Sequence, residues 1–159
     1  MRISGGRHRG RRLRVPRQAE LRPTAERARQ ALFNILVHGR LGGKLKGARV
    51  LDAFAGTGAL GLEALSRGAG HATFLERDRA AIASLRRNLA ALDEEERASV
   101  LSADATQPPP AAPGAAVAIA FLDPPYRSGL AGPALTALAA RGWLAPGALL
   151  AVETAAREA

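Results

Sequence analysis

From position 48 onward the chain alternates short apolar runs with stretches of helical periodicity, and this alternation constrains the fold more than any other feature. A repeated strand, helix, strand pattern builds a parallel sheet whose crossover connections are right-handed. The sequence therefore predicts an α/β fold, with a doubly wound, mostly parallel sheet that carries helices on both faces. The expected strands are Arg49–Ala53, Ala72–Glu76, Ser99–Ser102, Val117–Leu122 and Ala148–Glu153, and the expected helices are Ala59–Arg67, Arg79–Leu92 and Leu130–Ala140.

The first 47 residues follow a different pattern. Arg2–Ser4 and Arg11–Val15 are joined through a glycine-containing turn, which predicts a small basic ribbon closed by Pro16. Thr24 is then expected to cap a helix that Gly39–Gly43 ends. We divide the chain into an amino-terminal extension, residues 1–47, and a domain of alternating segments, residues 48–159. The helix should bury apolar residues at the i, i+3, i+4, i+7 spacing, namely Ala28, Ala31, Leu32, Ile35 and Leu36.

Positive charge is concentrated near the amino terminus. The 159 residues carry a formal charge of +9, but residues 1–49 hold 14 basic and 2 acidic side chains, whereas the remainder is slightly acidic. Crowded arginines repel one another without a counter-charge, so a polyanion is a natural partner for the extension, and a solubilising tail is the alternative. The expected polyanion contacts in the ribbon are Arg7, Arg9, Arg11 and Arg12.

Composition excludes several classes of function. The chain has no cysteine, which rules out disulfide scaffolds and thiolate chemistry and favours a reducing cytoplasm. No apolar run approaches the ~20 residues of a membrane span, so we expect a cytoplasmic protein without a membrane partner. His8, His38 and His71 lack metal-ligand spacing, and we expect each to face solvent or RNA. We therefore predict no metal site.

A glycine loop follows the first strand of the alternating region. Asp52-Ala-Phe-Ala-Gly56-Thr-Gly58 lets backbone N–H groups approach a ligand closely. Glu76 ends the next strand, where a carboxylate can accept both hydroxyls of a ribose, and Asp104 follows the third strand, where an adenine amine can be read. Asp52 repels phosphate and attracts an ammonium group, which favours a nucleoside with an amino acid tail. A glycine turn that only packs helix on strand is the alternative.

The tetrad Asp123-Pro-Pro-Tyr126 follows the strand Val117–Leu122, beside the glycine loop. Its two prolines remove two backbone donors, which leaves the preceding carbonyls free to accept hydrogen bonds. Asp123 and the Pro124 carbonyl can hold an exocyclic amine and aim its lone pair at an electrophile. Tyr126 offers a face to an unstacked base. An ordinary turn is the alternative interpretation.

Together the glycine loop and the tetrad resemble the amino-methylating branch of the S-adenosylmethionine-dependent methyltransferases, whose Rossmann-like fold is termed class I. More narrowly, the chain resembles the RsmD-type 16S ribosomal RNA guanine-N2 methyltransferases over nearly its whole length. The motifs that carry this resemblance are Met1-Arg-Ile, Gly10-Arg-Arg-Leu, Leu21-Arg-Pro-Thr24, Arg27, Ala31-Leu-Phe-Asn-Ile-Leu36, Val50–Ala69 and Phe121–Tyr126.

The resemblance implies an enzyme that methylates the N2 amine of one guanine in small-subunit ribosomal RNA, acting on ribosomal particles. It implies S-adenosylmethionine as cofactor and an in-line transfer of its methyl group. Arg22, Thr24, Arg27 and Asn34 match the family segment that lies near the cofactor and target base, so the resemblance implies that Arg22, Thr24 and Arg27 contact RNA together with the arginines of the ribbon. By motif, the cofactor contacts are Asp52, Phe54, Gly56, Gly58, Glu76, Asp104, Ala105 and Asp123, and the guanine contacts are Asp123, Pro124, Pro125 and Tyr126.

Three alternatives stay open. The tetrad also suits adenine N6 in DNA, because any planar amine can be held in the same way. A catalytically impaired RNA-binding module would bind RNA with a steep salt dependence and transfer nothing. Methylation of a protein glutamine usually goes with asparagine at position 123, so Asp123 disfavours it.

The chain departs from the family at its carboxyl end. A methyltransferase sheet usually has seven strands, the last two forming a hairpin, and this sequence ends at Ala159. We therefore expect a sheet without the last two strands and an edge strand open to association. All the cofactor and tetrad motifs precede this point.

Overall fold

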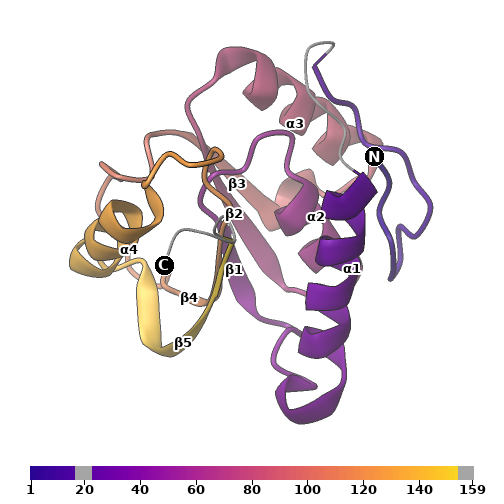
Figure 1. Ribbon diagram of the computed structural model, residues 1–159, viewed down its shortest axis with the longest axis horizontal. Helices are drawn as coiled ribbons and strands as arrows, with labels where there is room; N and C mark the ends of the chain where they lie inside the picture. Colours follow the sequence, from indigo (N-terminus) through magenta and orange to yellow (C-terminus); the bar gives the residue numbers. More distant parts are fainter. Residues whose placement is uncertain (17–22, 154–159) are drawn as a thin grey trace.

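The computed structural model describes residues 1–16 and 23–153, which form a five-stranded sheet with helices on both sides (Figure 1). The strand order is β3-β2-β1-β4-β5, and every neighbouring pair is parallel. The predicted doubly wound α/β fold is therefore confirmed. The strands are β1 (Arg49–Asp52), β2 (His71–Glu76), β3 (Ala98–Ser102), β4 (Val117–Leu122) and β5 (Leu144–Val152).

Strand β5 starts earlier than its sequence indicates. Pro146 and Gly147 resemble strand breakers, which placed the predicted start at Ala148. Leu144 nevertheless pairs with Val117, and the register between β4 and β5 then shifts before Ile119 pairs with Leu149. The irregularity accommodates the Pro-Gly pair, as bulges do in other sheets.

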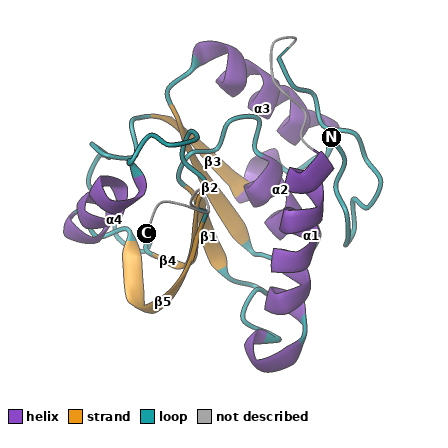
Figure 2. Ribbon diagram, viewed as in Figure 1, coloured by secondary structure: helices purple, strands orange, loops and turns teal. Residues whose placement is uncertain are grey.

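Two apolar clusters sandwich the sheet. Side chains alternate between the faces of a strand, so Phe74 and Phe121 join one cluster while Leu75 and Leu122 join the other. Helices α1, α2 and α3 cover the first face and α4 the second (Figure 2). The helices are α1 (Pro23–Val37), α2 (Ala59–Ser66), α3 (Arg79–Ala91) and α4 (Ala131–Ala140), with 3₁₀ turns η1 (Gly39–Leu41) and η2 (Glu95–Arg97).

The predicted buried face of α1 is wrong by about one residue. Leu36 is buried as predicted, but Phe33 and Arg29 are the other buried residues of this face, and Ile35 is 58% exposed. Phe33 packs on Phe121 of β4, with ring centroids 5.3 Å apart. Arg29 lies on the buried face of the helix, so a periodicity that counts only apolar residues does not identify this face. Ala28 and Ala31 are also exposed and Leu32 is partly buried, and the helix begins at Pro23, so Thr24 lies inside it rather than capping it.

The amino-terminal segment packs on the sheet domain. An antiparallel bridge joins Arg2 to Arg12, which confirms a ribbon of minimal length. Ile3 and Leu13 are 1% and 6% exposed and belong to the same apolar cluster as α2 and α3. The extension therefore shares its core with the domain that follows.

A buried carboxylate fastens this segment. Glu63 of α2 is fully buried and accepts the backbone N–H groups of Ser4 (2.9 Å) and Gly5 (3.0 Å). It also accepts the Nε–H groups of Arg29 (3.3 Å) and Arg67 (2.8 Å). Four donors thus surround one carboxylate, as a buried charge requires.

Candidate active site

Four acidic side chains lie at the carboxyl ends of neighbouring strands. Asp52 ends β1, Glu76 ends β2, Asp104 follows β3 and Asp123 follows β4. Ligands of open α/β sheets bind at this edge. A pocket of about 340 Å³ opens there, and its lining residues are Ala53, Phe54, Gly56, Leu75, Glu76, Arg77, Ala103, Asp104, Ala105, Asp123, Pro125 and Leu130.

Glu76 shapes the pocket as well as lining it. Its Oε1 accepts the Gly56 N–H at 2.8 Å, and its Oε2 accepts the N–H groups of Arg77 (3.0 Å) and Asp78 (2.8 Å). A carboxylate has about four acceptor positions, so three backbone donors leave room for one more. A ligand diol that takes two acceptor positions on Glu76 therefore competes with the Gly56 N–H.

The two glycines of the loop have different tasks. Gly56 has φ +56° and lines the pocket, and a Cβ atom there would meet nothing within 4 Å. Gly58 has φ +92°, is buried, and would bring a Cβ atom to 2.3 Å from Cδ1 of Leu85. Gly56 thus keeps the backbone open toward a ligand, whereas Gly58 lets the loop pack closely on α3.

Asp52 ends β1 next to Ala53 of the pocket lining, but it is 1% exposed and does not itself line the pocket. Its Oδ2 accepts the Gly61 N–H at 2.9 Å, and its Oδ1 is buried without a hydrogen-bond partner among the described residues. Burial, together with the charges of Asp123 and Glu76, raises the pKa of Asp52 to about 7, although the Gly61 hydrogen bond lowers it. A cation near Oδ1 would offset both the burial and the unmade hydrogen bond.

Asp104 is held rigidly at the rim. Its Oδ1 accepts the backbone N–H and the hydroxyl of Thr106, both at 2.8 Å, and its Oδ2 accepts from Arg77 at 3.4 Å. The Thr106 hydrogen bonds, with a smaller contribution from the charge of Arg77, lower the pKa of Asp104. Thr106 and Arg77 were not predicted from the sequence, although each lies within two residues of a predicted acid.

The tetrad is divided between the pocket and the surface. Asp123 and Pro125 line the pocket. Tyr126 is 63% exposed, and the guanidinium carbon of Arg127 lies 5.3 Å from its ring centroid. A base that stacks on Tyr126 has to share the ring with this guanidinium or displace it. Pro124 is partly buried.

The predicted RNA-contacting residues fall into two groups. Arg7 donates to both oxygens of Glu94 (3.2 and 3.0 Å), and Arg11 donates to the Ala91 carbonyl (2.9 Å), so both clamp the ribbon to the protein. Arg9, Arg12 and Arg27 are exposed. Arg22 and the side chain of Thr24 lie outside the described residues.

Two histidines are not the solvent or RNA contacts that we expected. His8 is 11% exposed, and its Nε2 lies 3.3 Å from Oε2 of Glu94. Glu94 also pairs with Arg97; burial would raise the Glu94 pKa, but Arg97, Arg7 and His8 lower it on balance. His71 faces Ser99 Oγ at 3.1 Å, and burial, assisted by Arg49, lowers its pKa. His38 is exposed.

Two further properties bear on the chemistry of the chain. Within residues 1–16 and 23–153, no three His, Asp or Glu side chains gather as metal ligands would. Of the helices that the structure describes, none is both long and apolar enough to cross a membrane.

Comparison with known proteins identifies relatives over nearly the whole chain. The family described as "Conserved hypothetical protein 95" matches residues 1–159. "Ribosomal RNA small subunit methyltransferase D" of Escherichia coli is 46% identical over 154 residues, which cover 97% of this chain and 74% of that protein. The Haemophilus influenzae protein of the same name is 41% identical over 158 residues, covering 97% and 78%.

Solved structures agree with this assignment. The Escherichia coli protein yhhF superposes with a TM-score of 0.83 at 42% identity, covering all of this chain and 83% of that one. The Thermus thermophilus protein TTHA0928 gives a TM-score of 0.76 at 35% identity, covering 97% and 85%. Fold, motifs and relatives coincide, so the resemblance inferred from the sequence is confirmed: the chain belongs to the RsmD family of ribosomal RNA small subunit methyltransferases.

Proposed function

We propose that this chain transfers a methyl group from S-adenosylmethionine to the N2 amine of a guanine in 16S ribosomal RNA. The observation that carries the proposal is that Asp123, the first residue of the tetrad, lines the same pocket as Glu76 and Asp104. One site thus combines an amine-holding group with acceptors suited to a nucleoside. Relatives that are named as small-subunit ribosomal RNA methyltransferases support the substrate class.

The residues present fit this cofactor. The buried, unpartnered Oδ1 of Asp52 suits a cationic amino acid tail, and Gly56 keeps the adjacent wall open. Glu76 has one acceptor position left for a ribose hydroxyl, and Asp104 and Ala105 line the same pocket and are assigned to the adenine. Phe54 lines the same pocket and can cover an apolar part of the ligand.

S-adenosylmethionine, when bound, supplies an electrophilic methyl group on a sulfonium sulfur. Methylation of guanine N2 by that group would release one proton from the amine, and the Asp123 carboxylate or water would accept it. Asp123 and the Pro124 carbonyl accept the amine hydrogens, which turns the N2 lone pair toward the methyl carbon. The electrophile is already activated, so Asp123 orients the amine and need not be a strong base.

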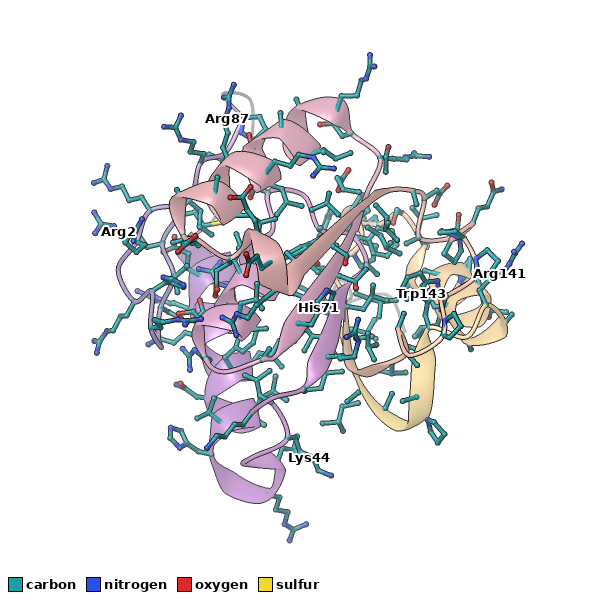
Figure 3. All side chains as sticks on the ribbon, turned by 180° about the vertical axis from the view of Figure 1, so that it is seen from behind. Arg2, Lys44, His71, Arg87, Arg141 and Trp143 are labelled. Carbon is teal, nitrogen blue, oxygen red and sulfur yellow. The ribbon has the colours of Figure 1, made fainter. Side chains whose placement is uncertain are left out.

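The RNA backbone would run over the ribbon and the neighbouring helix α3. The ribbon is fixed to this helix, because the Arg14 N–H donates to Asn88 Oδ1 at 2.7 Å and Arg11 donates to the Ala91 carbonyl. Arg86 and Arg87 are exposed on α3, and Figure 3 shows Arg2 and Arg87 projecting outward. Phosphate contacts by such side chains position the substrate without reading its sequence.

The test is a transfer assay with labelled S-adenosylmethionine and the purified chain. The substrates are naked small-subunit ribosomal RNA, small-subunit particles that lack the modification, and duplex DNA. We expect label in ribosomal RNA, mapped to guanine N2. Label in DNA adenine would replace the proposal with its closest alternative, and cofactor binding without transfer to any substrate would favour a non-catalytic RNA-binding module.

Two variants separate the roles of the acids. Asp123→Ala should abolish transfer and keep cofactor affinity, whereas Glu76→Ala should weaken cofactor binding measured by calorimetry. Turnover by Asp123→Ala equal to that of the wild type would rule out its orienting role, and unchanged affinity in Glu76→Ala would remove the ribose assignment.

A further inference from the structure

A second cavity, of about 370 Å³, adjoins the first at Asp123, which lines both. Its volume falls within the ~300–1,000 Å³ of small-ligand pockets. The walls are largely apolar and include Ala28 and Leu32 of α1, Leu60 of α2 and Ala151 of β5. Asp123 and Glu153 belong to the same lining, and so does Arg29, whose guanidinium donates to Glu63 and to the Arg2 carbonyl.

Strand pairing brings the backbones of Asp123 and Glu153 beside each other. Leu122 of β4 is paired in register with Val152 of β5, and the next residues along these parallel strands are Asp123 and Glu153. The Glu153 N–H donates to the Leu122 carbonyl at 2.9 Å, which continues the ladder beyond the last paired residues. The spacing of the two acids is therefore set by backbone pairing.

We propose that this second cavity receives the target guanine and that Glu153 accepts the N1 hydrogen, so that Glu153 selects guanine over other bases. This inference rests on the proposed function, and it adds the location of the base and the residue that reads it. Nothing in the sequence motifs pointed to Glu153.

The chemistry of the base matches this arrangement. The N1 and N2 positions of the guanine Watson–Crick edge carry three hydrogens, so this part of the edge presents only donors to two carboxylates that can only accept, while the O6 acceptor lies at the far end of the edge. Adenine presents an acceptor at N1, which would face the Glu153 carboxylate unfavourably. With Asp123 and the Pro124 carbonyl on the N2 amine, Glu153 accounts for the remaining donor of this edge.

The second cavity gives a role to apolar residues of α1 that are not buried in the core. Ala28 and Leu32 belong to the apolar stripe that the sequence predicted to be buried, yet Ala28 is exposed and Leu32 only partly covered. Both line the second cavity, where they can contact the faces of a base. A flipped base held between apolar side chains, with its edge on carboxylates, is a common way to read one nucleotide.

The test compares guanine with 2-aminopurine at the target position. The analogue keeps the N2 amine but has neither the N1 hydrogen nor the O6 atom. A change in base preference on mutation of Glu153 therefore reports on the proposed N1 contact. Particles are reconstituted from RNA that carries either base, and kcat/KM is measured for wild type, Glu153→Ala and Glu153→Gln. Glu96→Ala, on the exposed turn η2, is the matched control.

For wild type we expect about a 10- to 100-fold preference for guanine, the range for losing a hydrogen bond to a charged acceptor. Glu153→Ala should lose most of this preference, chiefly by turning over guanine more slowly. Glu153→Gln should also narrow it, because an amide can donate to the N1 of 2-aminopurine. Glu96→Ala should behave as wild type does.

Equal losses on both bases in Glu153→Ala and Glu153→Gln would overturn the inference, because a merely structural role lowers both rates together. A wild-type enzyme without preference would overturn it as well. Cofactor affinity, measured alongside, shows whether each variant is folded. Failure of the wild type to label any guanine would instead contradict the proposed function.

Discussion

Glu63 and Asp52 are both buried carboxylates, yet their surroundings differ sharply. Glu63 accepts four hydrogen bonds, two of them from arginines, and is 0% exposed. Asp52 is 1% exposed, accepts one backbone N–H, and leaves Oδ1 without a partner among the described residues. The described residues thus supply hydrogen-bond donors to both oxygens of Glu63, whereas they supply a donor to only one oxygen of Asp52.

The difference separates a structural acid from a binding acid. A buried charge is retained where its partners compensate its desolvation, and Glu63 meets that condition by joining the amino-terminal segment to α2. Asp52 does not meet it, and burial raises its pKa to about 7. Functional sites often hold such perturbed groups.

The largest effect is expected for Glu63→Ala. The change leaves Arg29 buried without its carboxylate and removes acceptors from the Ser4 and Gly5 N–H groups. We expect the free energy of unfolding to fall by about 3–5 kcal/mol, measured by denaturant titration. Glu95→Ala, an exposed control, should change it by less than about 0.5 kcal/mol. A loss below about 1 kcal/mol for Glu63→Ala would mean that Glu63 does not hold the amino-terminal segment in place.

Asp52→Asn should act on binding instead. The amide oxygen can keep the Gly61 hydrogen bond, but the neutral side chain no longer attracts a cationic tail. We expect affinity for S-adenosylmethionine to fall by about 10- to 100-fold, a factor typical of a lost charge-assisted contact. Calorimetric titration measures it, and affinity within twofold of wild type would place the cation elsewhere.

The same substitution should alter the dependence of stability on pH. The pKa of Asp52 is about 7 in the folded protein and near 3.8 in the unfolded chain, so ionisation favours unfolding. This group therefore costs stability increasingly as pH rises from about 4 to about 7, after which the cost levels off. Relative to wild type, Asp52→Asn should gain about 1–3 kcal/mol between pH 4.5 and pH 8. Parallel stability curves would contradict the raised pKa.

The smallest effects concern two arginines of the ribbon. Arg7 pairs with buried Glu94, so Arg7→Ala should cost about 1 kcal/mol of stability. Arg9 is exposed, so Arg9→Ala should leave stability unchanged and lower the salt dependence of RNA binding by about one phosphate contact. Thermal unfolding and salt-dependent binding titrations distinguish the two, and the reverse pattern would exchange their roles.

The sequence predicted the sheet well because each strand and helix carries its own local periodicity. The acids at the strand ends were predictable for the same reason, since parallel strands bring their carboxyl ends to one edge. Arg29, Glu63 and Glu94 were not, because a buried ion pair has no local signature and depends on segments far apart in the chain. The second cavity and Glu153 were missed because they depend on how α1 packs, and its buried face was predicted incorrectly.

The most direct measurement is the number of protons released when S-adenosylmethionine binds at pH 7. Calorimetry in two buffers of different ionisation enthalpy gives this number for wild type and for Asp52→Asn. With its pKa raised to about 7, Asp52 is partly protonated before binding, and a cation beside it would expel that proton. We predict that wild type releases a larger fraction of a proton than Asp52→Asn does. Identical release by the two proteins would contradict the assignment of Asp52 as the acid that the fold leaves open for the cofactor.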